Sequence, residues 1–229
     1  MPSWLSGMLN GLHATFIEDG RWEWFLSGLG YTLLISLFAV LIGLVLGILA
    51  AFGRLSKIKV FNWIAGIYID IIRGTPTMVQ VLIIYYVIFA GVTLPAWIVG
   101  VIAFSINSGA YIAEIVRGGI LSINPGQTEA GRSLGLTQTQ TMRYIIMPQA
   151  MKNILPALAN EFIVLIKETA VIGMVNNVDL LGAAKKVQTL TYDFLWPLVS
   201  CAAIYYVIIK ILTIILSKLE AQLRKSDKR

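Results

Sequence analysis

Five long, mostly apolar stretches constrain what this chain can fold into. They cover residues 27–51, 61–90, 95–116, 150–175 and 195–216. A helix of about 20 apolar residues crosses a bilayer, because no water in the hydrocarbon can satisfy free backbone groups. The composition agrees: 57% of the residues are hydrophobic, 13% are charged, and the mean hydropathy is +0.78. The sequence therefore predicts an all-α integral membrane protein with five transmembrane helices, and excludes a water-soluble monomer.

Composition also excludes several kinds of site. Cys201 is the single cysteine and His13 the single histidine, so no disulfide framework within the chain and no multi-histidine or cysteine-rich metal site is expected. The formal net charge is +6. In a chain this apolar we interpret that charge as a topology signal and not as a nucleic-acid-binding surface.

Lysine and arginine placement predicts the orientation. Twelve basic residues follow the first span, lie between the third and fourth, or follow the fifth, whereas three lie on the opposite side. The positive-inside rule then places the N-terminus outside and the C-terminus in the cytoplasm. No cleavage signal precedes the first span, so we expect it to be retained.

The chain divides into three regions. Residues 1–25 carry Trp4, Trp22 and Trp24 among polar residues and are expected to form an interfacial segment, whose simplest role is that of a membrane anchor. Residues 26–217 form one transmembrane domain, and residues 218–229 form a basic cytoplasmic tail.

The longest polar loop lies between the third and fourth spans, and its local signals predict a helix pair at about 124–147. Asn124 can cap a helix, Pro125 suits the first helical position, and Gln127 stands where a capping-box partner belongs. Glu129 lies near the positive end of that helix dipole. Gly135 can adopt the left-handed conformation that ends a helix.

A second helix is expected directly after this turn. The stretch from Thr137 to Gln140 reads as another capping box, and Pro148 is expected to limit the helix. Such a cytoplasmic helix pair either ties two spans together or docks a partner protein, and the local signals alone leave both possibilities open.

Charged residues inside the second span are candidates for function. A charge at mid-membrane costs about 2.5–3.5 kcal/mol on insertion scales. Asp70 and Arg73 share one helical face, and Pro76 disfavours helix at Thr75. A break there would expose backbone groups at a place where transporters bind substrates. The alternative is an internal ion pair between Asp70 and Arg73.

The fourth span carries a polar stripe. Asn160 aligns with Lys167, and Glu161 with Glu168, because seven residues make nearly two helical turns; Thr169 follows directly. A stripe this polar faces either a substrate path or a subunit interface.

Two further polar groups lie in the third span. Glu114 and Arg117 are expected to form a structural pair, since they are three residues apart on one helix. Ser105 and Asn107 either line the path or join helices by hydrogen bonds.

The loop resembles the EAA signature of the permeases of ABC importers. The matching residues are Glu129-Ala130-Gly131, then Gly135, then Ile145-Ile146-Met147-Pro148. Gly131 and Met147 depart mildly from that pattern, and Gly131 should weaken its helix by up to about 1 kcal/mol relative to alanine.

Further stretches resemble the permeases of polar-amino-acid importers, which handle histidine, glutamine, glutamate and basic amino acids. These stretches are Arg73-Gly74-Thr75-Pro76 with Gln80, residues 111–119, Pro125-Gly126-Gln127 and Pro148-Gln149. The resemblance extends from about residue 28 to residue 216.

The resemblance implies a coupling role for the loop and a set of partners. Residues that would dock on an ATP-binding cassette subunit are Glu129, Ala130, Gly131, Arg132 and Gly135. The chain has no phosphate-cradling G-x-x-x-x-G-K-[ST] motif, so ATP and Mg²⁺ would bind to that separate subunit, and no cofactor is expected in this chain. The family also uses a second permease chain, identical or paralogous, and an extracytoplasmic substrate-binding protein, all at the cell's inner membrane.

Seven residues are predicted to bind the substrate. They are Asp70, Arg73, Thr75, Asn160, Glu161, Lys167 and Thr169. Asp70 and Glu161 would receive cationic groups, while Arg73, Lys167 and Asn160 would receive the carboxylate. Two acids facing the cavity favour a basic amino acid. Two other functions stay open: a proton-coupled secondary transporter that uses Asp70 or Glu161 as proton carrier, and a scaffold subunit of a membrane complex.

Overall fold

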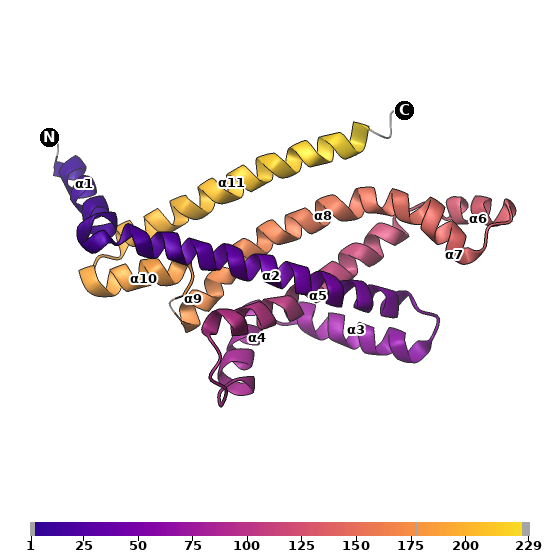
Figure 1. Ribbon diagram of the computed structural model, residues 1–229, viewed down its shortest axis with the longest axis horizontal. Coiled ribbons are helices and arrows are strands. Elements are labelled where there is room, and N and C mark those ends of the chain that lie inside the picture. Colours follow the sequence, from indigo (N-terminus) through magenta and orange to yellow (C-terminus); the bar gives the residue numbers. More distant parts are fainter. Residues whose placement is uncertain (1–2, 177, 226–229) are drawn as a thin grey trace. The chain divides into compact units, whose positions relative to one another are not determined.

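Figure 1 shows the computed structural model of the chain, which describes residues 3–176 and 178–225. Each element in this described part is a helix or a helical turn, as predicted. Lys228 and Arg229 of the predicted basic tail lie outside the described residues, and so does the side chain of Trp4.

The described elements are long helices joined by short turns. In chain order they are α1 (Ser3–Phe16), η1 (Glu18–Gly20), α2 (Trp22–Leu55), α3 (Lys59–Gly74), α4 (Thr77–Ile83), η2 (Ile84–Ile88), α5 (Ala96–Leu121), α6 (Pro125–Ser133), α7 (Gln138–Thr141), η3 (Met142–Ile146), α8 (Met147–Glu168), η4 (Thr169–Val171), α9 (Ile172–Val175), α10 (Leu180–Thr191) and α11 (Leu195–Lys225). The turns η2 and η3 are π-helical, and η1 and η4 are 3₁₀ turns.

Three helices in the described part are long and apolar enough to cross a membrane, or four if one broken pair counts as a span. The three are Glu18–Leu55, Ala96–Leu121 and Leu195–Ala221. The broken pair is Lys59–Gly74 with Thr77–Ile88. The predicted fourth span is divided among α8, η4 and α9 and is not among them. The count of five spans and the orientation stay predictions.

The expected interruption of the second span is confirmed. Helix α3 ends at Gly74, and Thr75 and Pro76 have extended backbone angles, with ψ of 148° and 132°. Proline cannot donate a backbone hydrogen bond and restricts the residue before it to extended conformations, so the helix must restart at Thr77.

The described chain forms two compact units. The first holds residues up to Ala39, Pro76–Phe104 and Val164–Ile211. The second holds Val40–Thr75, Ser105–Ile163 and the residues from Leu212 onward.

The first unit is organised around α10. Its buried apolar core consists of Phe25, Leu180, Ala183, Ala184, Val187 and Cys201. Gly28 lets α2 approach the start of α10, because a β-carbon there would lie 2.6 Å from the backbone oxygen of Asp179. Thr32 Oγ1 accepts a hydrogen bond from the Leu180 N–H at 3.2 Å and joins the same two helices.

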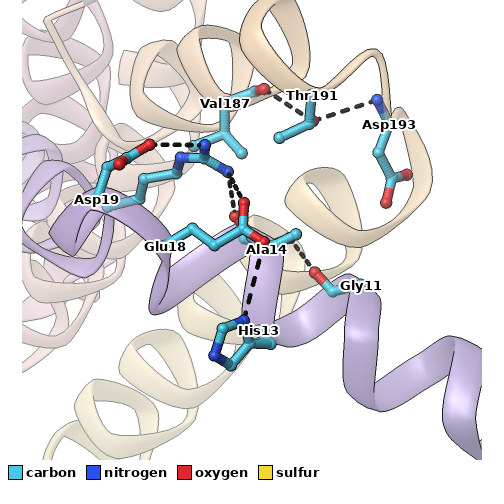
Figure 2. A network of polar contacts seen from close by, with 10 residues as sticks. Gly11, His13, Ala14, Glu18, Asp19, Val187, Thr191 and Asp193 are labelled. Carbon is cyan, nitrogen blue, oxygen red and sulfur yellow. Dashed lines mark hydrogen bonds and ion pairs between the residues drawn. The ribbon is translucent and has the colours of Figure 1, made fainter.

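Arg21 ties the predicted interfacial segment to the start of α2. Its side chain is buried and forms ion pairs with Asp19 at 3.0 Å and Glu18 at 3.3 Å. It also donates a hydrogen bond to the backbone oxygen of Ala14 in α1. Figure 2 shows these contacts, with His13 Nδ1 3.9 Å from the Glu18 carboxylate. Because a buried guanidinium is costly without partners, this network favours one placement of α1 against the entry to α2.

The second unit packs its helices through small residues. Its buried apolar core consists of Ala51, Ile69, Ile112, Ala113, Val116, Ile120, Ile146, Ala150 and Ile154. A β-carbon at Gly47 would lie 2.8 Å from the Gly109 carbonyl oxygen, and one at Gly109 would lie 2.6 Å from the Tyr68 hydroxyl. That hydroxyl donates a hydrogen bond to the Ile106 carbonyl at 2.6 Å. The second-unit parts of α2, α3 and α5 therefore meet at close backbone distance, which small residues permit in membrane helices.

The helix that follows the Gly135 turn does not end at Pro148, so that expectation is wrong. Helix α7 continues through the π turn η3 into α8, and the Met147 N–H donates to the Met142 carbonyl five residues earlier. A proline ring in a helix interior clashes with the carbonyl four residues back. The wider π turn accommodates the proline by a local change of helix type.

Asp179 is a fully buried carboxyl at the start of α10, outside the predicted spans. Its Oδ1 accepts a hydrogen bond from the Gly182 N–H at 2.9 Å, and its Oδ2 accepts one from the Tyr205 hydroxyl at 3.4 Å. Burial raises the pKa of this carboxyl from 3.8 to about 6 and outweighs the hydrogen bonds, which favour the ionised form.

We expect Asp179→Asn to flatten the pH dependence of stability. The folded carboxyl keeps its proton up to about pH 6, whereas the unfolded one loses it near pH 3.8. Its stabilising contribution is therefore complete below about pH 4 and is lost as the pH rises to about 6, by about 3 kcal/mol. The thermal unfolding midpoint of the wild type should fall more over this range than that of the variant.

Asp193→Asn is the matched control. Asp193 accepts a hydrogen bond from the Leu195 N–H at 2.9 Å and is half-buried. Its replacement leaves Asp179 in place, so this variant should still show the loss of stability between about pH 4 and 6 that Asp179 causes. Identical pH profiles for wild type and Asp179→Asn would contradict a protonated Asp179.

Candidate functional site

The seven residues predicted to bind substrate are divided between the two units. The second unit contains Asp70, Arg73, Thr75, Asn160 and Glu161, and the first contains Lys167 and Thr169. Within the second unit they occupy four places: an ion-pair cluster, the break after α3, a polar stretch of α8, and a cavity beside α3.

The ion-pair cluster joins α3 to α5. Arg73 lies 3.5 Å from the Glu114 carboxylate, and its guanidinium lies 5.4 Å from the centroid of the Tyr111 ring. Glu114 also accepts two hydrogen bonds from Arg117, at 2.8 and 2.7 Å. The predicted Glu114–Arg117 pair is thus confirmed. Arg73 pairs across helices with Glu114 and not with Asp70, so the internal pair considered from sequence is not the one that forms.

Thr75 stands in the break that follows the cluster. Its hydroxyl donates a hydrogen bond to the Ile71 carbonyl at 2.8 Å and satisfies one of the acceptors left free where α3 ends. Thr75 and Pro76 are exposed in the described chain, as a residue that meets a substrate must be.

Glu161 is a half-buried acid on α8 that meets a polar stretch of α5. The Ser108 hydroxyl donates a hydrogen bond to Glu161 Oε1 at 3.1 Å. Ser105 and Asn107 are buried on the same stretch of α5, each with 2% of its surface exposed. Asn160, next to Glu161, is exposed. Sequence reasoning named Ser105 and Asn107 but missed Ser108, although three polar residues within four positions of an apolar span were the available signal.

Asp70 lies apart from Arg73, in a cavity of about 800 Å³ along α3 and the end of α2. The lining includes Arg54, Lys57, Lys59 and Trp63. The sequence placed Asp70 and Arg73 on one face by spacing alone. In the structure Arg73 forms an ion pair with Glu114. Asp70 instead lines the same cavity as Lys57 and Lys59 of the α2–α3 turn.

The two predicted residues of the first unit differ in exposure. Lys167 is exposed near the end of α8. Thr169 is fully buried, and its hydroxyl donates to the Ile166 carbonyl at 2.8 Å within the helical chain. Thr169 therefore stabilises the junction of α8 with η4, and its hydroxyl proton is used in the hydrogen bond to Ile166.

The predicted coupling loop forms the helix pair α6 and α7, which lie side by side in Figure 1. Asn124 caps α6 by accepting a hydrogen bond from the Gly126 N–H at 2.8 Å, and Pro125 takes the first helical position, as predicted. Gln127 does not complete a capping box; its Oε1 accepts from Gln149 Nε2 at 3.4 Å. That expectation is wrong, because a tertiary partner on α8 competes successfully for the side chain.

The turn and the second helix form as the sequence predicts. Gly135 has a φ of 82°, in the left-handed region, and Arg132 donates a hydrogen bond to the Leu136 carbonyl at 2.7 Å across the turn. Thr137 and Gln140 form a complete capping box, at 3.3 and 2.8 Å. Both ends of the turn are thus held by local hydrogen bonds, which gives the pair a defined shape.

The helix pair exposes side chains suited to contact with a protein. Glu129, Ala130 and Arg132 are exposed, as the coupling role requires. Leu134 is 80% exposed and Tyr144 is 64% exposed. Sequence reasoning did not single out these last two, although apolar residues in a polar loop were the available signal. Tyrosine and arginine are enriched among residues that dominate protein–protein contacts.

Comparison with known families decides the assignment of the chain. Residues 43–225 match the model of the binding-protein-dependent transport system inner membrane component. The chain belongs to this family. It is therefore an inner-membrane protein with several membrane-spanning helices, and the predicted membership of the ABC importer permeases is confirmed.

Individual relatives agree with this assignment. The chain is 39% identical over 204 residues to the arginine transport system permease protein ArtQ of Bacillus subtilis, covering 88% of this chain and 93% of ArtQ. It is 34% identical over 209 residues to the L-cystine transport system permease protein TcyB of the same organism, covering 90% and 89%. A crystal structure titled as an amino acid ABC transporter with histidines matches at a TM-score of 0.84 and 45% identity, covering 87% and 94%.

The family match and these relatives support a permease subunit of an amino-acid ABC importer. Such a permease implies an ATPase and a substrate-binding protein as partners. Among the described residues there is no group of three or more histidine, cysteine or acidic side chains that could hold a metal ion.

Gly131 departs from the family signature, and its surroundings explain why glycine stands there. It is buried, and a β-carbon there would lie 2.8 Å from Thr141 Cγ2 and 2.9 Å from Ile145 Cδ1. Its glycine thus lets α6 pack against α7 and η3. The cost in helix propensity anticipated from sequence is offset by this close approach.

We expect Gly131→Ala, which restores the family pattern, to destabilise the helix pair. Alanine gains up to about 1 kcal/mol of helix propensity. Overpacking against Thr141 costs about 1–3 kcal/mol, so the net effect is a loss. The thermal unfolding midpoint of the purified protein measures it. Gly118→Ala is the control, since nothing lies within 4 Å of a β-carbon there; a Gly131→Ala protein more stable than wild type would contradict the packing argument.

Proposed function

We propose that the chain is the membrane-spanning permease of an ATP-driven importer that carries polar, basic amino acids by alternating access. The observations that carry this proposal are the family match over residues 43–225 and the half-buried Glu161 carboxylate on α8, which accepts a hydrogen bond from the Ser108 hydroxyl. An acid inside a membrane-spanning segment is a candidate receptor for the cationic group of a substrate.

The contrast with Glu114 supports this choice. Glu114 is shared by Arg73 and Arg117, so its charge is compensated inside the protein. Glu161 is bonded to Ser108 at 3.1 Å. Because the charge of Glu114 is already compensated, we assign the guanidinium or ammonium group of a basic amino acid to Glu161. Asn160, exposed beside it, offers an amide for the substrate carboxylate.

The role of the remaining predicted residues follows from their places. We assign Thr75 to the substrate path, because the break in the second span exposes backbone there. Asp70 and Lys167 are exposed and stay candidates for substrate contact, whereas Arg73 and Thr169 act mainly by stabilising the helices around the path.

Transport would be driven from outside this chain. We propose that α6 and α7 dock on a separate ATP-binding cassette subunit through the exposed Glu129, Ala130, Arg132 and Gly135. Gly131, also predicted to dock, is buried and instead lets α6 pack against α7. ATP and Mg²⁺ bind to that subunit, since the chain has no phosphate-cradling motif. A second permease chain, identical or paralogous, and an extracytoplasmic binding protein complete the importer.

Glu161→Gln should lower the uptake of arginine and lysine relative to that of glutamine. Glutamine keeps the volume and the acceptor for Ser108 but removes the charge. A charged hydrogen bond is worth about 1.5–3 kcal/mol, so arginine uptake should fall at least about tenfold while glutamine uptake changes little. Uptake by the reconstituted importer, with a panel of amino acids in competition, measures the ratio.

Glu220→Gln on α11 is the matched control, because it makes the same change of charge on another helix. A ratio of arginine to glutamine uptake that stays the same in Glu161→Gln would rule out Glu161 as the selective acid. It would leave the importer assignment intact.

A cysteine at Ala130 should cross-link to the ATPase subunit. The background is Cys201→Ala, which removes the single native cysteine. Thr189→Cys, exposed on α10 and outside the predicted coupling loop, is the control. Products between permease and ATPase should form with Ala130→Cys and not with Thr189→Cys. The docking proposal fails if neither variant, or only Thr189→Cys, captures the ATPase.

A further inference from the structure

A basic cavity of the second unit lies at the turn between α2 and α3. It has a volume of about 800 Å³, and its lining includes Arg54, Lys57 and Lys59 together with one carboxylate, Asp70. Figure 1 shows α3 folding back beside the end of α2 at this turn. Three cations beside one carboxylate leave an excess of positive charge around the cavity, which favours the binding of an anion.

Arg54 is held in place before any ligand arrives. Its guanidinium donates a hydrogen bond to Asn62 Oδ1, and Asn62 Nδ2 donates back to the Arg54 carbonyl at 2.5 Å. The guanidinium lies over Gly66 of α3, where a β-carbon would be in ordinary van der Waals contact with Arg54 Cζ at 3.5 Å. An arginine fixed in this way can receive a phosphate oxygen without first losing side-chain freedom.

The same cavity has an exposed apolar wall. Val60 is 61% exposed, Trp63 is 67% exposed and Ile67 is 38% exposed, and all three line the cavity. Tryptophan favours the depth of the lipid headgroups, where one end of the side chain meets polar groups and the other meets hydrocarbon. A soluble anion would leave this wall in water, whereas a lipid would cover it.

We propose that this cavity binds the headgroup of an anionic glycerophospholipid, phosphatidylglycerol, from the cytoplasmic leaflet. The phosphate lies among Arg54, Lys57 and Lys59, and the acyl chains lie along Trp63 and Ile67. Basic pockets at the cytoplasmic ends of membrane helices bind anionic headgroups by these forces. The assignment rests on the positive-inside orientation and is independent of the amino acid transported.

The test is lipid retention by the full-length permease in native mass spectrometry. The probes are phosphatidylglycerol and phosphatidylcholine, added separately to the purified protein. Wild type should retain phosphatidylglycerol selectively. The double variant Lys57→Gln/Lys59→Gln should lose about 25-fold in apparent affinity for it, at about fivefold for each cation.

The matched control is Lys210→Gln/Lys218→Gln, which removes the same charge from α11 outside the cavity. Selectivity that survives in this control and disappears in the cavity variant supports the site. An equal loss in both variants, or equal retention of the two lipids by wild type, overturns it.

Two further measurements exclude other occupants. Glycerol 3-phosphate should not displace the lipid at concentrations comparable to it; displacement would identify a site for soluble phosphate compounds and overturn the proposal. Retention by single permease chains but not by paired ones would show that a second copy covers the cavity, and would equally overturn it.

Discussion

Hydrocarbon offers no hydrogen-bond partner, and this constraint explains most of what the described chain does with its polar groups. The described chain is helical almost throughout, so most backbone N–H and C=O groups are hydrogen-bonded within helices. Where the second span breaks, the Thr75 hydroxyl returns to the Ile71 carbonyl. Arg73, the charge nearest the break, is paired with Glu114 on α5. The break can therefore persist at membrane depth without leaving a charge uncompensated.

Glu114 and Glu161, two acids of the second unit, differ in their bonding partners. Glu114 is bonded to two guanidiniums and joins α3 to α5. Glu161 is bonded to the hydroxyl of Ser108. A carboxylate shared by two cations contributes mainly to the fold, because its charge is compensated within the protein. Both are half-buried glutamates, so exposure alone does not distinguish them.

Glycine has two distinct uses in this chain. Gly135 provides a left-handed turn between α6 and α7, which needs a residue with no β-carbon. Gly47 and Gly131 have ordinary helical backbones and instead allow close packing, against Gly109 and Thr141 respectively. The α2–α5 contact and the packing of α6 against α7 both depend on this second use, because in each case two helices approach closely where a β-carbon would clash.

The sequence by itself determined the features that depend on neighbouring residues. The apolar stretches, the break at Pro76, the Asn124 cap and the Gly135 turn are each specified within a few positions, because the hydrogen bonds or backbone restrictions involved are local. Only the tertiary structure decided which distant groups pair. Gln127 could cap its own helix but meets Gln149, and a helix continues past Pro148 because a π turn precedes it. Those outcomes are set by helix packing, where a partner's position depends on the fold and not on sequence spacing.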